Sequence, residues 1–338
     1  MRPKKRVVTA ADRLAGRRTP TVRKPRSAII PATKPRVAPV PSDPDVVRTA
    51  AIRRDAAAAD ETGQTPDLAV DLGRGLVLGN PILVASGTFG YGVEYGEVVD
   101  VQRLGAICCK GTTLKARIGN RTPRVTETPA GMLNSIGLQN PGVDAVVEKY
   151  AAIWRGWRVP VVVNVAGESV GDYVEVVRRL DGVPGVAGIE LNISCPNVGK
   201  GGLQFAIDAE AAGQVTAAVR RVTDLPLLGN VYGGVSGPAI KPIALRIVYE
   251  VAQIVDIPVV AIGGVTELAD VLDYLAAGAV AVQVGTAIFA DPALPVRLVD
   301  ELAGECRRRG LATHRDLVGT ALPPRATQPS AKGVEYRP

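Results

Sequence analysis

The stretch VAGIELNISCPNVGKGG (residues 186–202) is the part of the chain that decides the fold class. Its first eight residues, VAGIELNI, are mostly apolar, which is typical of a buried strand. The pattern breaks at Pro196, which cannot donate to a strand ladder, and a glycine-rich loop follows. A thiol, Cys195, therefore comes just after the carboxyl end of a predicted strand, between Asn192 and Asn197. On these residues alone, Cys195 is a buried thiol, a metal ligand or a catalytic group.

Five further runs share the continuous apolar character that parallel strands have when helices cover both faces. They are PILVAS (81–86), GAICCK (105–110), PVVVNVAG (160–167), PVVAIGG (258–264) and AVAVQVG (279–285). Helical patterns lie between them at 170–180, 208–222, 240–255, 267–278 and 292–310. The alternation predicts an α/β fold, either a TIM-type (β/α) barrel or a doubly wound sheet.

The ends of the predicted strands favour the barrel, because a barrel builds its site from the carboxyl ends of several strands. Those ends carry polar residues or glycines, namely Ser86, Lys110, Gly111, Asn164, Asn192, Gly263, Gly264, Gly285 and Thr286. The glycines after the last two strands suit a phosphate site of backbone N–H groups. A doubly wound nucleotide-binding fold would place GxGxxG after its first strand, and GTFGYG (87–92) has a different glycine spacing.

The titratable residues limit the chemistry and the cellular compartment. The chain contains four cysteines without a CxxC pair, which is neither a disulfide framework nor a metal-cluster pattern and favours a reducing cytoplasm. Its single histidine, His314, lies close to the carboxyl terminus, so histidine-based catalysis is not expected. Cys108 and Cys109 lie in the middle of a predicted strand and are interpreted as buried hydrophobic residues. No apolar run approaches membrane-spanning length.

The net charge of +7 belongs to the amino-terminal region. Residues 1–65 contain 15 lysines and arginines and six acidic residues, so the remainder of the chain carries a net charge of −2. This region is rich in proline and alanine, and we predict a disordered extension before a domain over 66–311 and a tail over 312–338. A solvated extension without a specific role is the first interpretation, so binding to nucleic acid is not expected. An arm for nucleic acid or an anionic surface is one alternative, and a transit peptide is another.

Eight motifs occur in a fixed order over residues 68–310 and carry a family resemblance. They are ASGTFGYG, KGTT, NSIGLQNPGVD, NVAG, ELNISCPNV, GGVSGPAIKPIALR, AIGGV and VQVGTA. Together they resemble the catalytic subunit of class 1B, NAD-linked dihydroorotate dehydrogenase, an FMN-dependent barrel enzyme of pyrimidine synthesis. The resemblance implies oxidation of (S)-dihydroorotate to orotate, with a hydride passing to FMN.

The resemblance also implies roles for individual residues. Cys195 is the implied base, and the implied substrate contacts are Lys110, Asn134, Ser135, Ile136, Gly137, Leu138, Asn192 and Asn197. The implied FMN contacts are Ser86, Lys110, Gly111, Asn164, Asn192, Gly237, Gly263, Gly264, Gly285 and Thr286, and the last four of these would hold the phosphate. Each residue also has a purely structural interpretation, and only the ordered set favours the catalytic one.

The sequence departs from the family pattern at VTDLPLLGNVYGGVSG (222–237). Members of the family have a strand, a helix and a further strand between the equivalents of Pro226 and Gly229. Roughly 45 residues are therefore absent, and six strands are recognised where a closed barrel has eight. The absent part carries the lysine of the family's KLSPN motif, which contacts the flavin, and an Asn-Thr pair that binds the pyrimidine. We therefore expect an incomplete barrel.

The resemblance implies partners as well. NAD-linked members pass electrons to a separate subunit that carries FAD and a 2Fe–2S cluster, and a homodimer of catalytic subunits forms the centre of a heterotetramer. This chain has no dinucleotide fingerprint or cluster spacing of its own. Two other functions stay open: another FMN-dependent barrel that acts on a pyrimidine, and a non-catalytic relic that serves as a binding subunit.

Overall fold

The computed structural model describes residues 65–193, 209–230 and 234–323. Its main feature is a seven-stranded parallel sheet with the strand order β11-β12-β3-β4-β7-β8-β9. The strands are β3 (Ile82–Val84), β4 (Ala106–Thr112), β7 (Val161–Val165), β8 (Val186–Asn192), β9 (Leu227–Asn230), β11 (Val260–Ile262) and β12 (Ala281–Val284). Because β9 and β11 are both edge strands, the sheet does not close, which confirms the prediction of an incomplete barrel.

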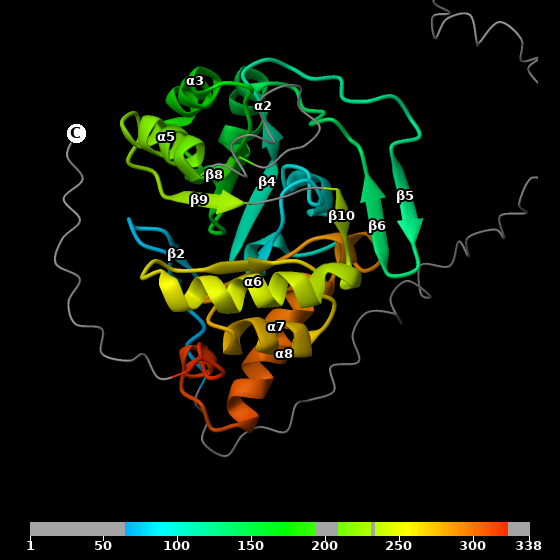
Figure 1. The fold of residues 1–338 in the computed structure, drawn as a ribbon, viewed down its shortest axis with the longest axis vertical. Coiled ribbons are helices and arrows are strands. Elements are labelled where there is room, and N and C mark those ends of the chain that lie inside the picture. The colour runs from blue at the N-terminus through cyan, green and yellow to red at the C-terminus, as the bar shows by residue number, and fades with distance from the viewer. Residues whose placement is uncertain (1–64, 194–208, 231–233, 324–338) are drawn as a thin grey trace, which may run out of the picture. The chain divides into compact units, whose positions relative to one another are not determined.

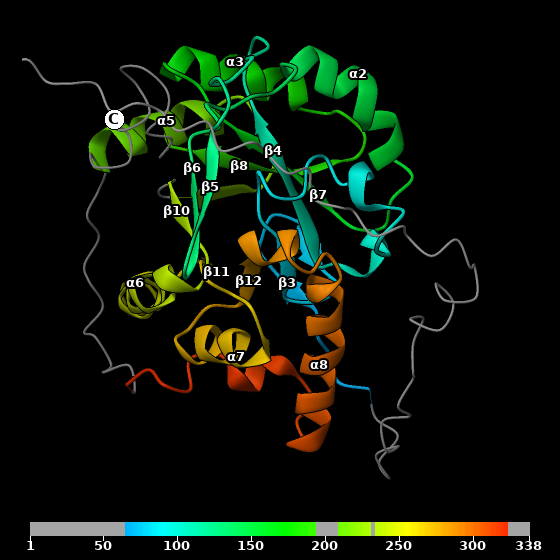
Figure 2. The same ribbon diagram turned by 90° about the vertical axis from the view of Figure 1, so that its right-hand side faces the viewer.

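Helices follow the strands and cover the outer face of the sheet. They are α2 (Val143–Trp154), α3 (Val170–Leu180), α5 (Ala209–Arg220), α6 (Lys241–Ile254), α7 (Leu268–Ala276) and α8 (Leu294–Arg308). In Figures 1 and 2, α2, α3 and α5 lie together at the top, and α6, α7 and α8 lie together at the bottom. A capping box between Ser169 and Asp172 begins α3, and Glu267 and Asp270 form another at α7.

The strands bury both of their faces, as their continuous apolar runs predict. The outer face packs against the helices in one large cluster that includes Trp154, Tyr173 and Tyr274. The inner face contributes Leu83, Cys108 and other residues to a second cluster, together with the hairpin β1 (Val70–Asp71) and β2 (Val77–Leu78). The hairpin therefore covers part of the inner face of the sheet.

A small antiparallel sheet stands apart from the main sheet, in the order β10-β6-β5. Its strands are β5 (Val125–Thr128), β6 (Gly131–Asn134) and β10 (Val235–Ser236). Since β10 follows β9 after only a few residues, the chain passes from the edge of the main sheet to this small sheet and then into α6. The single-turn helices are η2 (Val93–Tyr95), η3 (Val101–Arg103), η4 (Pro238–Ile240), η5 (Thr286–Phe289) and η6 (His314–Leu317).

The packed part of the chain extends beyond residue 311. Thr313 forms a bridge with Asp67, and both His314 and Leu317 are buried. The predicted amino-terminal extension lies outside the described residues, apart from Thr65, and so does the chain after residue 323. No helix in the described ranges is long and apolar enough to span a membrane.

Candidate active site

The carboxyl ends of the parallel strands place most of the predicted site residues along one edge of the sheet. Lys110 and Gly111 lie near the end of β4, Asn164 near the end of β7, and Asn192 at the end of β8. Ser86 follows β3, Gly263 and Gly264 follow β11, and Gly285 and Thr286 follow β12. The order of strands in the sheet therefore brings together segments that are up to 200 residues apart in sequence.

A buried hydrogen-bond network connects Asn192 with the inside of the sheet. Asn192 Nδ2 donates to Asn164 Oδ1 at 3.2 Å, and Asn164 Nδ2 donates to Glu190 Oε1. The other oxygen of Glu190 accepts from Gln283 Nε2 at 2.9 Å. Glu190 and Asn164 are each only 1% exposed, so the network has almost no contact with solvent. Because a carboxylate only accepts hydrogen bonds, Glu190 fixes the amide orientation of Asn164 and, through it, that of Asn192.

Lys110 and Gly111 lie where the pairing of β4 with β7 is irregular, between Cys109 and Thr112. Such an irregularity redirects side chains and is common beside active sites. Burial lowers the pKa of Lys110, and the nearby guanidinium of Arg124 lowers it further. Among the described residues, no acidic group forms an ion pair with the Lys110 ammonium. It is thus a half-buried cation that suits an anionic ligand.

Gly111 allows the predicted substrate loop to approach the sheet closely. A Cβ atom at this position would lie 2.9 Å from Asn164 Oδ1 and 3.2 Å from Leu138 Cδ2. The predicted substrate loop, Asn134 to Leu138, begins at the last residue of β6. Its Leu138 lies beside Asn164, because both side chains approach the same point at Gly111. Any side chain at position 111 would push Leu138 and Asn164 away from the strand.

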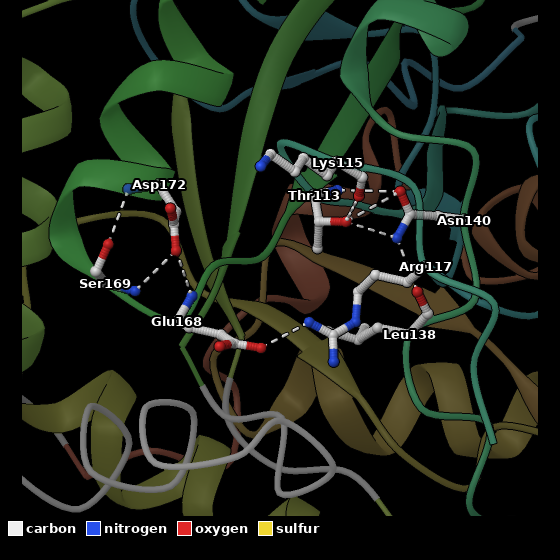
Figure 3. Close-up of polar contacts among 8 residues, drawn as sticks. All are labelled: Thr113, Lys115, Arg117, Leu138, Asn140, Glu168, Ser169 and Asp172. Carbon is white, nitrogen blue, oxygen red and sulfur yellow. Dashed lines mark hydrogen bonds and ion pairs between the residues drawn. The ribbon is translucent and has the colours of Figure 1, made fainter.

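Asn140 holds this loop in place, as Figure 3 shows. Its side chain, 5% exposed, accepts from the backbone N–H of Thr113 at 3.2 Å and donates to the Leu138 carbonyl at 2.7 Å. It also accepts from Gly142 N–H at 2.9 Å, and its backbone exchanges two hydrogen bonds with Arg117. Leu138 has φ +53°, a left-handed conformation that costs energy in a residue with a side chain. The Asn140 contacts stabilise that conformation.

Arg117 extends this set of contacts to the next strand-to-helix loop. Its guanidinium pairs with the carboxylate of Glu168 at 2.7 Å, just before the capping box that begins α3 (Figure 3). Both side chains are partly exposed, so the pair contributes little to stability alone. Its effect is geometric, because it joins the loop after β4 to the loop after β7 at the rim of the site.

Gly264, one of the residues predicted to hold the phosphate, lies close to Gly237. A Cβ at Gly264 would lie 3.1 Å from the Gly237 carbonyl, and Gly237 and Gly264 have φ of +100° and +69°. Within the described part of the chain, the backbone N–H groups of Gly264, Gly285 and Thr286 have no hydrogen-bond partner. Unpaired amides at the start of η5 and in the adjacent loop suit an anionic group. These residues therefore fit the phosphate end of FMN.

The ring end of the implied site is less complete. β9 pairs with β8, yet its residues, Leu-Leu-Gly-Asn, include no lysine. Cys195 and Asn197, the predicted base and its neighbour, lie outside the described residues. Cys108 and Cys109 are fully buried as predicted, and burial raises the pKa of Cys109 to about 12. These two thiols cannot supply a thiolate near neutral pH.

Three residues of this region were absent from the sequence prediction. Glu190 and Gln283 stand within predicted strands, where a polar residue in an apolar run is a usable signal for a buried network. Asn140 stands in the quoted motif NSIGLQNPGVD but was assigned no role. Only the geometry shows that it holds the loop.

Comparison with known proteins settles the family. A model of the dihydroorotate dehydrogenase family matches residues 73–231 and 227–305. The chain belongs to the dihydroorotate dehydrogenase family. The catalytic subunit of dihydroorotate dehydrogenase B (NAD(+)) from Geobacter sulfurreducens is 43% identical, covering 76% of this chain and 98% of that protein. The protein of the same name from Porphyromonas gingivalis is 40% identical, and the match covers 75% of this chain and 97% of that protein.

Solved structures support the same fold. The crystal structure of DHODH from Eimeria tenella in complex with ferulenol superposes with a TM-score of 0.67 at 18% sequence identity. That match covers 77% of this chain and 90% of the other. At this level of identity, the likeness bears on the fold alone.

The comparisons also locate the missing segment. The two matches to the family model meet at residues 227–231, where the sequence analysis placed the gap. The alignment with the Geobacter sulfurreducens protein spans 301 residues but uses 76% of the 338 residues here, about 257. About 44 positions of the relative therefore lack a counterpart, in agreement with the roughly 45 absent residues predicted from the sequence.

Proposed function

We propose that the chain binds FMN at the carboxyl edge of its sheet and oxidises (S)-dihydroorotate to orotate in pyrimidine synthesis. Membership of the family supports this proposal, and so does the site geometry. The observation that carries it is that Asn164 and Leu138 meet at Gly111 while Asn164 accepts from Asn192, which joins residues from three strands and the predicted substrate loop.

The chain's own residues would divide the work as follows. FMN, when bound, supplies the hydride acceptor. Asn192, held by Asn164 and Glu190, and the amides of the 134–138 loop would orient the pyrimidine, whereas the Lys110 ammonium would attract its carboxylate. Cys195 would take the carbon-bound proton, since the described thiols at 108 and 109 are buried and protonated. The free amides after β11 and β12 would bind the phosphate.

An absorbance spectrum and an activity assay test this function together. The flavin spectrum of the purified chain should show partial occupancy that rises on addition of FMN, because no lysine is present on β9. Turnover should be faster with dihydroorotate than with dihydrouracil. No flavin binding at high FMN concentration would favour the non-catalytic relic, and a preference for dihydrouracil would favour another pyrimidine-specific barrel.

We further propose a separate electron-transfer subunit as partner. The relatives carry the name of a catalytic subunit of an NAD(+)-linked enzyme, which implies that another subunit completes the path. An FAD and 2Fe–2S protein docked on a homodimer of this chain, in a cytoplasmic heterotetramer, would supply the NAD site. The three free thiols in the described residues, Cys108, Cys109 and Cys306, are compatible with a reducing compartment.

A further inference from the structure

Two side chains of α7 hold the turn that joins β11 to this helix, residues 263–266. Tyr274 is fully buried, and its hydroxyl donates to the Gly263 carbonyl at 2.6 Å. Asp270, one helical turn earlier, accepts from the backbone N–H of Thr266 at 2.7 Å and from its hydroxyl at 2.8 Å. Positions four residues apart lie on the same face of a helix. One face of α7 therefore fixes both ends of the turn.

The contact from Tyr274 sets the direction of the next backbone amide. In a planar trans peptide unit, the C=O of one residue and the N–H of the next point in opposite directions. The Gly263 carbonyl points to Tyr274 on α7, so the Gly264 N–H of the same peptide unit points away from α7. This N–H is one of the amides near the predicted phosphate site that have no hydrogen-bond partner within the described residues. The Tyr274 hydroxyl thus determines which way a free amide faces.

The backbone of the turn also leaves little room for change. Gly263 and Gly264 have φ of +128° and +69°, which favour glycine over residues with a side chain. A Cβ at Gly264 would lie 2.8 Å from the Cβ of Lys241, the first residue of α6. The turn is therefore enclosed by the start of α6 as well as by α7, which lie beside each other in Figures 1 and 2.

Both α7 side chains keep these contacts over a wide pH range. Burial raises the pKa of Tyr274 to about 12, so its hydroxyl stays protonated and can donate. Burial also acts to raise the pKa of Asp270, but hydrogen bonds from Lys241 and Thr266 hold it below its usual value. Asp270 is 4% exposed, and the Lys241 ammonium pairs with it. The ion pair joins the turn to α6.

We propose that Tyr274 and Asp270 are positioning residues for FMN, which hold the turn over 263–266 so that the Gly264 amide faces the phosphate. The inference rests on the proposed function, since the phosphate is that of FMN. A hydrogen bond from an amide to a phosphate oxygen is charge-assisted and weakens when its angle departs from linear. A peptide unit that can rotate would therefore bind the phosphate less tightly. Both side chains act through the turn.

Riboflavin lacks the phosphate of FMN, so the ratio of the two dissociation constants isolates the phosphate end of the site. The flavin-free full-length chain would be titrated with each flavin and followed by flavin fluorescence. In Tyr274→Phe the Kd for FMN should rise about five-fold, the scale of one hydrogen bond, while the Kd for riboflavin changes by less than about two-fold. A purely structural role would change both constants by the same factor.

Asp270→Asn is the second variant and decides the question if Tyr274→Phe does not fold. An amide offers one acceptor oxygen where a carboxylate offers two, so the Thr266 end of the turn loses part of its support. FMN binding should again weaken more than riboflavin binding. Circular dichroism would verify that each variant is folded.

Tyr173→Phe is the matched control. Tyr173 is also fully buried on an outer helix, and its hydroxyl donates to the Asn192 carbonyl at 2.7 Å, far from the phosphate glycines in the strand order. This variant should leave the ratio of the two constants unchanged. A wild-type ratio in the folded α7 variants would overturn the positioning role alone, as would a wild type that binds FMN no more tightly than riboflavin. A wild type that binds neither flavin would overturn the proposed function as well.

Discussion

Glu190 shows how one buried residue can determine the chemistry of a site that it does not reach. Among the described residues, no lysine or arginine forms an ion pair with Glu190. Its two side-chain oxygens instead accept hydrogen bonds from the side-chain amides of Asn164 and Gln283. Burying a carboxyl group without an ion pair costs folding free energy, so the presence of Glu190 in a mostly apolar strand needs a reason. The orientation of Asn164 and Asn192 provides that reason.

We expect Glu190→Gln to weaken ligand binding without weakening the fold. An amide at position 190 can donate as well as accept, so Asn164 can turn over and Asn192 is no longer fixed. Orotate and FMN should bind about 10-fold more weakly, the scale of one lost hydrogen bond. The midpoint of thermal unfolding should stay level or rise, since a buried charge is removed.

Titrations followed by flavin absorbance measure the weaker binding of orotate and FMN. Lower stability with unchanged binding would contradict the positioning role, and Glu97→Gln on the surface is the control.

Cys195 is the residue on which turnover should depend most. A serine hydroxyl is far harder to ionise than a thiol, so Cys195→Ser should lower kcat by about 100-fold or more and move the pH–rate profile upward. Steady-state rates with dihydroorotate and a dye acceptor from pH 6 to 10 would show both effects. Full activity of the variant at pH 7 would rule out a role as base.

At the scale of whole elements, Asn140 connects the substrate loop to the end of β4. Asn140→Ala would leave the buried N–H groups of Thr113 and Gly142 without partners, which costs about 1–3 kcal/mol of folding free energy. It would also release Leu138, so KM for dihydroorotate should rise. Asn80→Ala is the matched control, because Asn80 is likewise buried but bonds to Arg103 and Ile82 at the amino end of the sheet. Urea unfolding should show a loss for both variants, and only Asn140→Ala should change KM.

The helices and strands could be predicted where a local pattern was strong. The six predicted strands and five predicted helices are all present, because continuous apolar runs and 3.6-residue periodicity are set locally. β9 was not predicted as a strand, since its four residues pair with β8 only because the gap brings them there. In the small sheet β5 and β6 pair as a local hairpin, whereas β10 joins β6 through residues about 100 apart in sequence, a pairing that no local pattern encodes. α2 has a helical pattern and could have been found.

Parallel strand pairing accounts for the positions of those predicted site residues that stand at strand ends. Parallel pairing brings Lys110, Asn164 and Asn192 to one edge whatever the intervening helices are. The buried partners of these residues depend on inward-facing positions across four strands, and the sequence alone did not reveal them. Glu190 and Gln283 are 93 residues apart and meet only in the assembled sheet.

The segment after α8 joins the two ends of the packed chain through His314. Its backbone N–H donates to the Asp67 carbonyl, its side chain is fully buried, and burial lowers its pKa below 6.5. Between the folded-state pKa and 6.5, the unfolded chain binds a proton that the folded chain does not, so stability should fall as pH decreases below about 6.5. His314→Leu should flatten this dependence, because the chain has no other histidine. Urea unfolding from pH 8 to 5 measures the free energy of unfolding at each pH. If it depends on pH in the variant as it does in the wild type, His314 is excluded as the cause.

At the scale of the whole molecule, the missing segment leaves most of the predicted site residues in the chain but leaves the sheet open. The glycines predicted to hold the phosphate and the buried network are described, since they come from β4, β7, β8, β11 and β12 and the turns after them, and the predicted substrate loop begins at the end of β6. Seven of the eight strand positions of a closed barrel are filled in the described sheet, and the open one lies between β9 and β11. Edge strands with unpaired backbone groups are points of association. The chain therefore combines most of the predicted site residues at strand ends with a sheet edge that a complete barrel would cover.

The last expectation concerns the path of the electrons, because the sequence predicts no NAD site in this chain. It lacks the glycine fingerprint that binds a dinucleotide, and no group of three or more potential metal ligands occurs among the described residues. With dihydroorotate and added FMN, the isolated chain should therefore reduce an artificial dye but not NAD. Adding an electron-transfer subunit that carries FAD and a 2Fe–2S cluster, taken from the same organism as the chain, should restore NAD reduction. The same subunit without its FAD is the control and should not restore it. NAD reduction by the isolated chain would show that the electrons leave the flavin directly and that no partner is needed.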